Sequence, residues 1–309
     1  MSASGLRVFI TGATGFVGAA ILDELAGAGL EVVGLTRRPE ATNAVAAAGA
    51  RPVLGDLQRP EDWIDVAANC DVVVHAGQQS MGFPISAESV AATAAVDGVA
   101  LEGILKAAEV GRIQTILYTS GLWSYGDHGD DWIDESTPLT ADGVDLLRGQ
   151  REDRLMSAAD RLGLRACVMA LGNVYGPGRS FAGYVERARA GQHSYHGDGR
   201  CFMSPIHHAD VAVAYRRAIE LPVGGERFNV CDDEPIRSRA HAEFLCAAVG
   251  SAPPRSMPKD EAVSILGPLH VRSLGQSIRM SNRKLRSMLD WAPRYASFRD
   301  GVAEVVGRV

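Results

Sequence analysis

The first candidate for chemistry in this 309-residue chain is a glycine-rich segment at residues 11–18. Its glycines, Gly12, Gly15 and Gly18, follow an apolar strand-like run at 6–10 and open a helix-like segment. With this spacing the first glycine permits a tight turn, the second lets the backbone approach a pyrophosphate, and the third allows close helix–sheet packing. Backbone amides and the positive end of the helix dipole then hold the phosphates. We therefore expect a dinucleotide-binding loop rather than a ligand-free turn, with contacts from Thr11, Gly12, Thr14, Gly15, Phe16, Val17 and Gly18.

The residues after the second strand-like run, at 32–35, bear on which dinucleotide is bound. A carboxylate at this place accepts a hydrogen bond from the ribose 2′-hydroxyl of NAD, whereas an arginine can grip a 2′-phosphate through two hydrogen bonds. The chain continues here with Thr36, Arg37 and Arg38. We therefore expect NADP held by Arg37, with NAD as the alternative if both arginines are ordinary solvated loop charges.

Two later strand ends add candidates for cofactor contacts. Asp56, followed by Leu57, comes after the run at 51–54 and could accept from an adenine amino group or cap a turn. His75 ends the run at 72–76 and is followed by Ala76 and Gly77. This histidine is either a ligand contact beside the cofactor cleft or a structural side chain with both nitrogens satisfied.

The segments that would position these residues alternate along the first half of the chain. Apolar runs at 6–10, 32–35, 51–54, 72–76, 115–119 and 166–171 are separated by helix-like segments, among them 87–109 and 146–162. Strands that are apolar throughout and joined by helices form a parallel sheet covered on both faces, with its ligand at the carboxyl ends of the strands. The predicted class is α/β: a Rossmann doubly wound parallel sheet with a smaller C-terminal α/β substrate domain.

The rhythm changes after residue 173. Loops rich in glycine and proline appear at 175–178 and 197–199, and later segments mix a short strand at 227–230 with a helix at 238–249. We expect a dinucleotide-binding domain over 1–173, completed by 208–231, and a substrate-binding domain over 174–207 and 232–309.

Motifs spread over nearly the whole chain carry a family resemblance. Besides residues 11–18 and 55–57 they are Tyr118-Thr119-Ser120-Gly121, Ser124-Tyr125-Gly126, the stretch 172–178, Gly197-Asp198-Gly199, His207 with Asp210-Val211-Ala212, and Lys284 ahead of 289–293. In this order they resemble the extended short-chain dehydrogenase/reductases, which include nucleotide-sugar epimerases and dehydratases and dihydroflavonol-type reductases. The resemblance implies a Rossmann domain, a C-terminal substrate domain and a homodimer formed through two helices that flank the sheet.

The family's catalytic pair, Tyr-x-x-x-Lys on a helix, is absent. In that pair the lysine charge lowers the tyrosine pKa, so that the phenol can exchange a proton while the cofactor exchanges a hydride. None of the chain's lysines has a tyrosine four positions earlier: Lys106, Lys259 and Lys284 follow Glu102, Arg255 and Met280.

Alignment along the helix at 146–162 gives two registers for the missing pair. Counting back from Gly163 puts Asp145 and Gly149 at the two positions, and a one-residue shift puts Val144 and Arg148 there. The family's asparagine ahead of the fifth strand is also replaced, with Asp97 the nearest match.

Three functions remain open after this departure. The leading one is an NADP(H)-binding oxidoreductase, a reductase or epimerase-like enzyme of a small carbonyl or sugar-like substrate, with a non-standard proton donor. Ser120 would polarise the carbonyl and Tyr125 is a conceivable acid. The second is a lyase, isomerase or cyclase that uses Asp145, Arg148 or Arg151, although charges on a helix are more often only solvated. The third is a catalytically inactive NADP sensor or scaffold.

Substrate contacts are expected where the strands end. The candidates are Ser120 and Gly121 after the fifth strand, Asn173 after the sixth, and Arg200 after the Gly197–Gly199 turn, in the region where nucleotide-sugar relatives hold phosphates. We take these four residues, with Asp145 as a further catalytic candidate, as the expected substrate side of the site.

Composition narrows the partners and the location. The net charge is −6 and the basic residues are scattered, which argues against nucleic-acid binding. Five cysteines without a Cys-x-x-Cys pair indicate reduced thiols and no metal cluster. The N-terminus runs directly into a strand pattern and no apolar run is long enough to span a membrane, so we expect neither signal peptide nor membrane contact. A cytoplasmic protein with a small-molecule substrate is the expected result.

Overall fold

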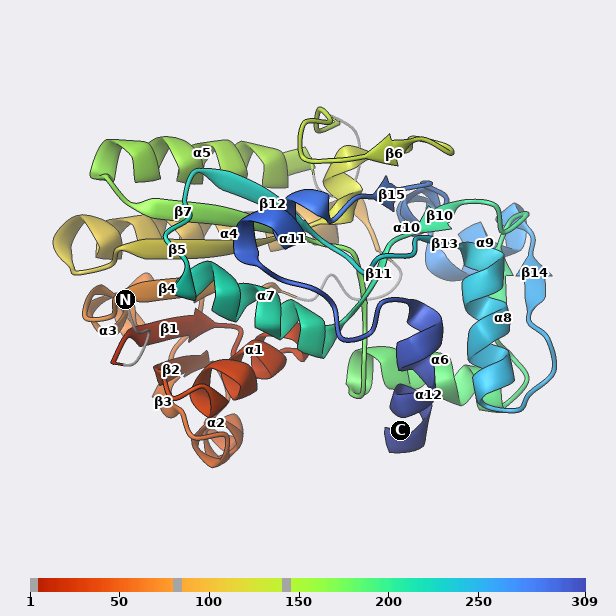
Figure 1. Cartoon of the computed structure of the whole chain (residues 1–309), viewed down its shortest axis with the longest axis horizontal. Helices are drawn as coiled ribbons and strands as arrows, with labels where there is room; N and C mark the ends of the chain where they lie inside the picture. The colour runs from red at the N-terminus through yellow and green to blue at the C-terminus, as the bar shows by residue number, and fades with distance from the viewer. Residues whose placement is uncertain (1–4, 80–84, 141–145) are drawn as a thin grey trace.

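The computed structural model describes residues 5–79, 85–140 and 146–309, and its centre is a seven-stranded sheet (Figure 1). All neighbouring strands are parallel. Their order across the sheet is β3 (Arg51–Leu54), β2 (Glu31–Thr36), β1 (Arg7–Thr11), β4 (Val72–His75), β5 (Thr115–Gly121), β7 (Arg165–Leu171) and β12 (Glu226–Val230). The order reverses between β1 and β4, where such sheets bind their ligands.

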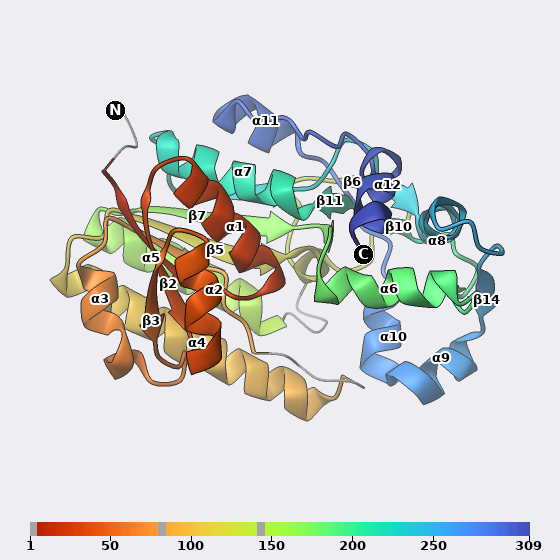
Figure 2. The same ribbon diagram turned by 90° about the horizontal axis from the view of Figure 1, so that it is seen from below.

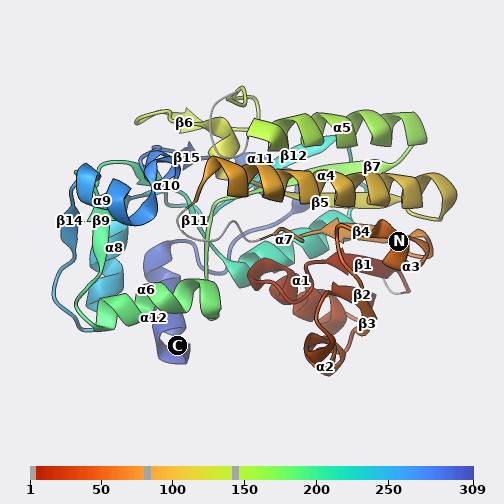
Figure 3. The ribbon, with the colours of Figure 1, turned by 180° about the vertical axis from the view of Figure 1, so that it is seen from behind.

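Helices cover both faces of this sheet. On one face α1 (Phe16–Gly27) and α7 (His208–Glu220) form a buried cluster with the sheet, joined by α11 (Arg283–Leu289). On the other face lie α3 (Ile64–Ala68), α4 (Ala87–Val110) and α5 (Leu146–Leu162), and Figure 3 brings α4 and α5 to the front. The short α2 (Thr42–Ala47) follows β2. The predicted doubly wound α/β sheet is confirmed.

Burial explains why these strands read as apolar throughout. Val8, Phe9 and Ile10 of β1 are fully buried, and their side chains alternate between the two faces of the sheet. Val8 and Ile10 pack in the cluster with α1 and α7, and Phe9 packs in the cluster with α3, α4 and α5. Burying each such side chain contributes about 1.5–3 kcal/mol. The edge strand β3 is half-exposed, as an edge strand is covered by a neighbour on one side only.

The C-terminal half alternates short strand pairs with helices. The pairs are β8 (Asn173–Tyr175) with β11 (Pro205–His207), β9 (Ser194–His196) with β14 (Arg255–Met257), β10 (Phe202–Met203) with β13 (Ile236–Arg237), and β6 (Trp132–Ile133) with β15 (Arg279–Met280). The helices are α6 (Arg179–Arg189), α8 (Ser238–Ala248), α9 (Lys259–Leu266), α10 (Pro268–Leu274) and α12 (Phe298–Arg308). Figure 2 shows α6, α8, α9 and α10 at the end of the molecule away from α2 and α3.

The chain leaves the central sheet after β7 and later returns to it. Residues 173–207 build β8, α6, β9, β10 and β11, and then α7 packs along α1 and β12 pairs with β7. Three short 3₁₀ helices complete the part of the chain that the structure describes: Pro39–Ala41, Pro60–Asp62 and Leu122–Tyr125. Within the described residues no helix combines the length and apolarity needed to cross a membrane.

Candidate functional site

The loop between β1 and α1 has the geometry of a phosphate cradle. Gly12 has φ +70°, and a Cβ on it would stand 2.6 Å from Gly77 Cα and 2.7 Å from the Ala76 carbonyl oxygen. The Gly15 N–H donates to the Gly12 carbonyl at 2.8 Å. Only glycine fits this combination of a left-handed backbone and a backbone neighbour at contact distance.

The start of α1 is open to an anion. Gly15 is the N-cap residue, no side chain caps the helix, and Thr14 and Gly15 are exposed. The first amides of a helix lack partners within it and carry its positive dipole end. A Cβ on Gly18 would collide with the Gly12 carbonyl oxygen, so this glycine lets α1 approach the loop itself as well as the sheet. These residues fit a dinucleotide pyrophosphate.

The remaining cofactor candidates lie at the carboxyl ends of neighbouring strands. Arg37 directly follows β2 and is exposed. One carboxylate oxygen of Asp56 accepts from the Gln58 amide at 2.9 Å, so Asp56 makes the turn contact that we considered as the alternative to adenine binding. Leu57 lies beside Gly77, because a Cβ on Gly77 would stand 3.0 Å from Leu57 Cδ1.

His75 belongs to a buried hydrogen-bond chain beneath the loop. Its Nδ1 lies 2.7 Å from Thr11 Oγ1, which accepts from the Gly77 amide at 3.1 Å. Its Nε2 lies 3.0 Å from Asp97 Oδ1, and the Tyr118 hydroxyl donates to Asp97 Oδ2 at 2.6 Å. The ring therefore has the two partners of a structural histidine, and its place beside Thr11 and Gly77 supports the loop.

Asp97 contributes a carboxylate to this hydrogen-bond chain. Burial by itself would raise its pKa, but the hydrogen bond and charge of His75 together with the Tyr118 hydroxyl lower the pKa to about 2. Arg151 on α5 adds an ion pair, with its Nε 3.3 Å from Asp97 Oδ2. From the sequence Arg151 was either a possible catalyst or a solvated helix charge; in the structure its ion pair with Asp97 holds α5 against α4.

A second buried network surrounds Ser120. The Ser120 hydroxyl donates to Glu152 Oε1 at 2.5 Å, and Glu152 forms an ion pair with Arg227. Arg227 Nε donates to the Tyr125 hydroxyl at 3.1 Å, and that hydroxyl donates to Asn229 Oδ1 at 2.7 Å. Ser120 and Tyr125 are 2% and 1% exposed. The proton that Ser120 would offer to a carbonyl is directed to Glu152 in this arrangement.

Glu152 and Arg227 were missed as members of the site. Both are charged and nearly buried, and burial raises the pKa of the Tyr125 phenol despite the neighbouring Arg227 guanidinium. The one sequence signal was Arg227 in a strand that also holds the apolar residues Phe228 and Val230, since a charge in a buried strand needs a partner. Nothing in the sequence pattern indicates that Glu152, 75 residues earlier, is that partner.

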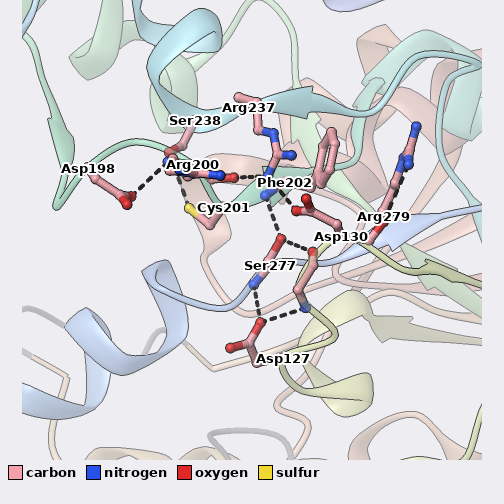
Figure 4. Close-up of polar contacts among 11 residues, drawn as sticks. Asp127, Asp130, Asp198, Arg200, Cys201, Phe202, Arg237, Ser238, Ser277 and Arg279 are labelled. Carbon is pink, nitrogen blue, oxygen red and sulfur yellow. Dashed lines mark hydrogen bonds and ion pairs between the residues drawn. The ribbon is translucent and has the colours of Figure 1, made fainter.

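The predicted substrate residues lie in different surroundings. Gly121 is the last residue of β5, and the side-chain oxygen of Asn173, Oδ1, accepts from the Ser204 amide at 2.9 Å, which ties β8 to β11. Arg200 is exposed on the turn after Asp198, whose carboxylate accepts from the Arg200 amide at 3.0 Å (Figure 4). Asp145 lies outside the described residues.

The surroundings of Arg200 are cationic and aromatic. Figure 4 shows Arg237 and Arg279 against the Phe202 ring, with their guanidinium carbons 3.8 and 4.7 Å from its centroid. Arg237 also pairs with Asp130 at 2.8 Å and donates to the Arg200 carbonyl. Among the described side chains no cluster of histidine, cysteine and carboxylate could hold a metal ion.

Comparison with known proteins gives full-length relatives that are reductases by name. A 3-diazoavenalumate denitrifying reductase of a Streptomyces species is 29% identical over 315 residues, covering 96% of this chain and 99% of that protein. A 4-hydroxy-2-methyl-3-oxo-4-farnesyl-3,4-dihydroquinoline-1-oxide ketoreductase of Stigmatella aurantiaca is 27% identical, covering 94% of this chain and 92% of that protein.

Solved structures share the fold over nearly the whole chain. The human epimerase family protein SDR39U1 (isoform 2) with NADPH has a TM-score of 0.83 at 19% identity and covers 98% of this chain and all of that one. The UDP-glucose 4-epimerase of Thermus thermophilus, in complex with NAD, has a TM-score of 0.83 at 22% identity, covering 98% of each chain.

The model of the NAD dependent epimerase/dehydratase family matches residues 8–231. That span contains the phosphate cradle, the His75–Asp97 chain and the Ser120–Glu152–Arg227 network. The chain therefore belongs to the NAD dependent epimerase/dehydratase family and is an NAD(P)-dependent oxidoreductase.

Proposed function

We propose that the protein is an NADP(H)-dependent reductase of a small organic substrate. The observation that carries the proposal is the cradle of Gly12, Gly15 and Gly18 at the open start of α1, in a chain with full-length relatives that are named as a reductase and a ketoreductase. A reduced nicotinamide, when bound there, supplies a hydride. The residues of this chain then have to bind the substrate, exclude water and provide any proton that the reaction needs.

Arg37 supports the choice of NADP. It is exposed directly after β2, the strand beside β1 at the cradle, and no carboxylate stands next to it in sequence. A guanidinium there can form two charge-assisted hydrogen bonds to a 2′-phosphate. NAD remains the alternative cofactor.

Among the described residues no phenol is placed to protonate the substrate, which favours substrates whose reduction does not depend strongly on a proton donor. The Ser120 hydroxyl donates to Glu152, the Tyr125 phenol donates to Asn229, and the chain has no Tyr-x-x-x-Lys pair. Reduction of a small carbonyl or sugar-like ketone would then take its proton from solvent or from a group other than a phenol. Loss of a positioned acid typically costs about 10²–10⁴ in rate, which slows such an enzyme without stopping it.

A second candidate substrate class needs no proton. An aryl diazonium carbon that accepts a hydride forms a C–H bond while the C–N bond breaks and N₂ leaves, so charge and atoms balance without an acid. The hydroxyls of Ser120 and Tyr125 already donate hydrogen bonds to Glu152 and Asn229, which favours a substrate that needs no proton. The name of the Streptomyces relative, a denitrifying reductase of a diazo compound, favours this class too.

The test is turnover with NADPH carrying deuterium at the transferable position. A panel of small ketones, a keto-sugar and an aryl diazonium salt is offered, and NADPH loss is compared with product formed. A reductase gives one oxidised cofactor per product and deuterium in the product. Conversion without net NADPH loss identifies an epimerase-like reaction, or the lyase, isomerase or cyclase alternative. Cofactor binding with no conversion across the panel identifies a sensor or scaffold, and either outcome overturns the proposal.

Assembly and location are proposed as they were expected from the sequence. The family resemblance implies a homodimer through two sheet-flanking helices, and α4 and α5 lie side by side on one face with Val99 of α4 42% exposed. A small-molecule substrate, no nucleic acid and a cytoplasmic location complete the proposal. Light scattering on the purified chain measures its oligomeric state.

A further inference from the structure

A threonine at the end of β1 lies directly beneath the phosphate cradle. Thr11 is fully buried, and its hydroxyl oxygen accepts from the Gly77 amide at 3.1 Å. The same oxygen lies 2.7 Å from Nδ1 of His75, the last residue of the neighbouring strand β4. One hydroxyl thus joins the ends of β1 and β4, the two strands between which the order of the sheet reverses.

Gly77 is the residue through which this hydroxyl reaches the cradle. The backbone of Gly77 touches the turn at Gly12, because a Cβ on Gly12 would stand 2.6 Å from Gly77 Cα and 2.7 Å from its nitrogen. The Gly12 carbonyl in turn accepts from the Gly15 amide at 2.8 Å, and Gly15 is the N-cap residue of α1. A shift of Gly77 would therefore move the turn and, with it, the first amides of α1.

His75 fixes the position of the Thr11 hydroxyl. The ring is 1% exposed, and its second nitrogen, Nε2, lies 3.0 Å from Asp97 Oδ1. The other carboxylate oxygen of Asp97 accepts from the Tyr118 hydroxyl at 2.6 Å and pairs with Arg151 at 3.3 Å. Side chains locked by such surrounding hydrogen bonds hold a binding site in its productive geometry. His75 is therefore held at both ends, by the Thr11 hydroxyl and by a carboxylate that β5 and α5 keep in place.

We propose that Thr11 and His75 are positioning residues for the dinucleotide, and that they act on its pyrophosphate through the backbone of Gly77 and Gly12. Both side chains are buried, and the Gly77 amide is directed to Thr11 rather than to a phosphate. Thr11, His75 and Gly77, which we expected as cofactor contacts, thus support the cradle from beneath and act on the cofactor only through it.

The two cofactors depend equally on this support. NADPH and NADH share the pyrophosphate and differ in the 2′-phosphate, which the proposed function assigns to Arg37, directly after β2. The role of Thr11 and His75 rests on the proposed function only in that the ligand of the cradle is a dinucleotide. Weaker support at either residue should thus lower the affinities for NADPH and NADH by the same factor, whereas Arg37→Ala should change their ratio.

The test is titration of the full chain with NADPH and with NADH, for two substitutions at Thr11. Thr11→Val keeps the shape but has no hydroxyl, so Gly77 and His75 each lose a partner, and we expect both affinities to fall at least about tenfold. Thr11→Ser keeps the hydroxyl and should lower them by less than about threefold. The matched control is Thr115→Val, at the amino end of β5. Thr115 is also fully buried, but its hydroxyl has no hydrogen-bond partner among the described residues, so both affinities should stay unchanged.

His75 is tested by two substitutions that each keep one of its hydrogen bonds. The amide of asparagine ends near the place of Nδ1, and that of glutamine near the place of Nε2, so His75→Asn keeps the bond to Thr11 and His75→Gln the bond to Asp97. We expect His75→Gln to lower both affinities about tenfold and His75→Asn about threefold. Thermal unfolding should show similar losses of stability, since each variant gives up one bond of the ring. A residue that only stabilises the fold would not separate affinity from stability in this way.

Equal affinities of the two His75 variants, or of Thr11→Ser and Thr11→Val, overturn the proposal, and so does a loss confined to NADPH. If Thr11→Val does not fold, the two His75 variants give the same comparison. Hydride transfer from NADPH by a wild type whose affinities Thr11→Val leaves unchanged would refute this proposal alone. Equal loss of both affinities in a chain that transfers no hydride would refute the proposed function alone.

Discussion

Arg37 is the residue on which the proposed preference for NADP(H) depends. It follows β2 directly, it is exposed, and its charge is available to the surface at the carboxyl edge of the sheet. Hydrogen bonds to a charged group contribute about 1.5–3 kcal/mol each, more than most surface contacts. A preference of this origin is therefore large enough to measure with a single substitution.

Replacing Arg37 with alanine is expected to weaken NADPH binding about 10–100-fold and to leave NADH binding nearly unchanged, because only NADPH carries the 2′-phosphate. Fluorescence titration of both cofactors measures the change. Arg51→Ala is the control. Arg51 is also exposed, but it is the first residue of the neighbouring strand β3 and so lies at the amino ends of the strands, away from the carboxyl ends where Arg37 lies. Equal affinities of the wild type for NADPH and NADH would refute this role of Arg37.

Single site residues differed in how far the sequence could predict them. The turn of the cradle could be predicted because Gly15 and Gly18 contact Gly12 within a short stretch of sequence, whereas the close approach of Gly12 to Ala76 and Gly77 could not be derived from that spacing. The partner of Ser120 could not, because Glu152 reaches it only once β5, β7 and α5 are packed together. His75 was left open between two roles, and the structure gives both of its ring nitrogens protein partners.

At the scale of elements, the junction of β1 and α1 depends on how closely the helix approaches the loop. Gly18 is the contact point, because a Cβ there would meet the backbone of Gly12 rather than the end of a flexible side chain. The helix would have to move away from the loop, and its first amides would move with it. Cofactor binding and stability are thus coupled through one helix.

Substituting Gly18 with alanine is expected to weaken NADPH binding at least about tenfold and to cost about 1–3 kcal/mol of stability, the usual effect of overpacking. Thermal unfolding and NADPH titration measure the two effects. Gly27→Ala is the matched control: it lies at the other end of α1, a Cβ there would have no atom within 4 Å, and alanine is the better helix former. If Gly18→Ala matched this control in both measurements, the close approach of α1 to Gly12 would be needed neither for NADPH binding nor for stability.

Long periodic elements could be predicted and short ones could not. The expected helix at 87–109 is α4, Ala87–Val110, and the expected helix at 146–162 is α5. Strand β5 extends to Gly121, two residues beyond the expected end, because Ser120 and Gly121 still pair with β7. The two- and three-residue strands β6, β8, β9, β10, β11, β13, β14 and β15 were not expected, since so short a segment has no periodicity to detect.

At the scale of the whole molecule, the two halves meet around buried carboxyl groups. Asp210 at the start of α7 accepts from the amides of Arg294 and Tyr295 at 2.8 and 3.1 Å, and burial raises its pKa to about 6. Asp232, just after β12, is 1% exposed, and its Oδ2 has no partner among the described residues. Burial, with the nearby carboxylates, raises the pKa of Asp232 to about 9 despite the Glu234 amide bond.

A carboxyl group whose pKa is higher in the folded than in the unfolded protein stabilises the fold below the unfolded pKa and loses that effect as pH rises to the folded value. For Asp232 the window runs from 3.8 to about 9, with a slope of up to about 1.4 kcal/mol per pH unit. Urea unfolding at about pH 7 and about pH 8.5 should show lower stability at the higher pH. Asp232→Asn, neutral at both, should flatten this difference, whereas the exposed Asp198→Asn should keep the wild-type slope. If the asparagine at 232 left the slope unchanged, the carboxyl of Asp232 would be ionised in the folded protein, and the meeting of the two halves would not depend on its proton.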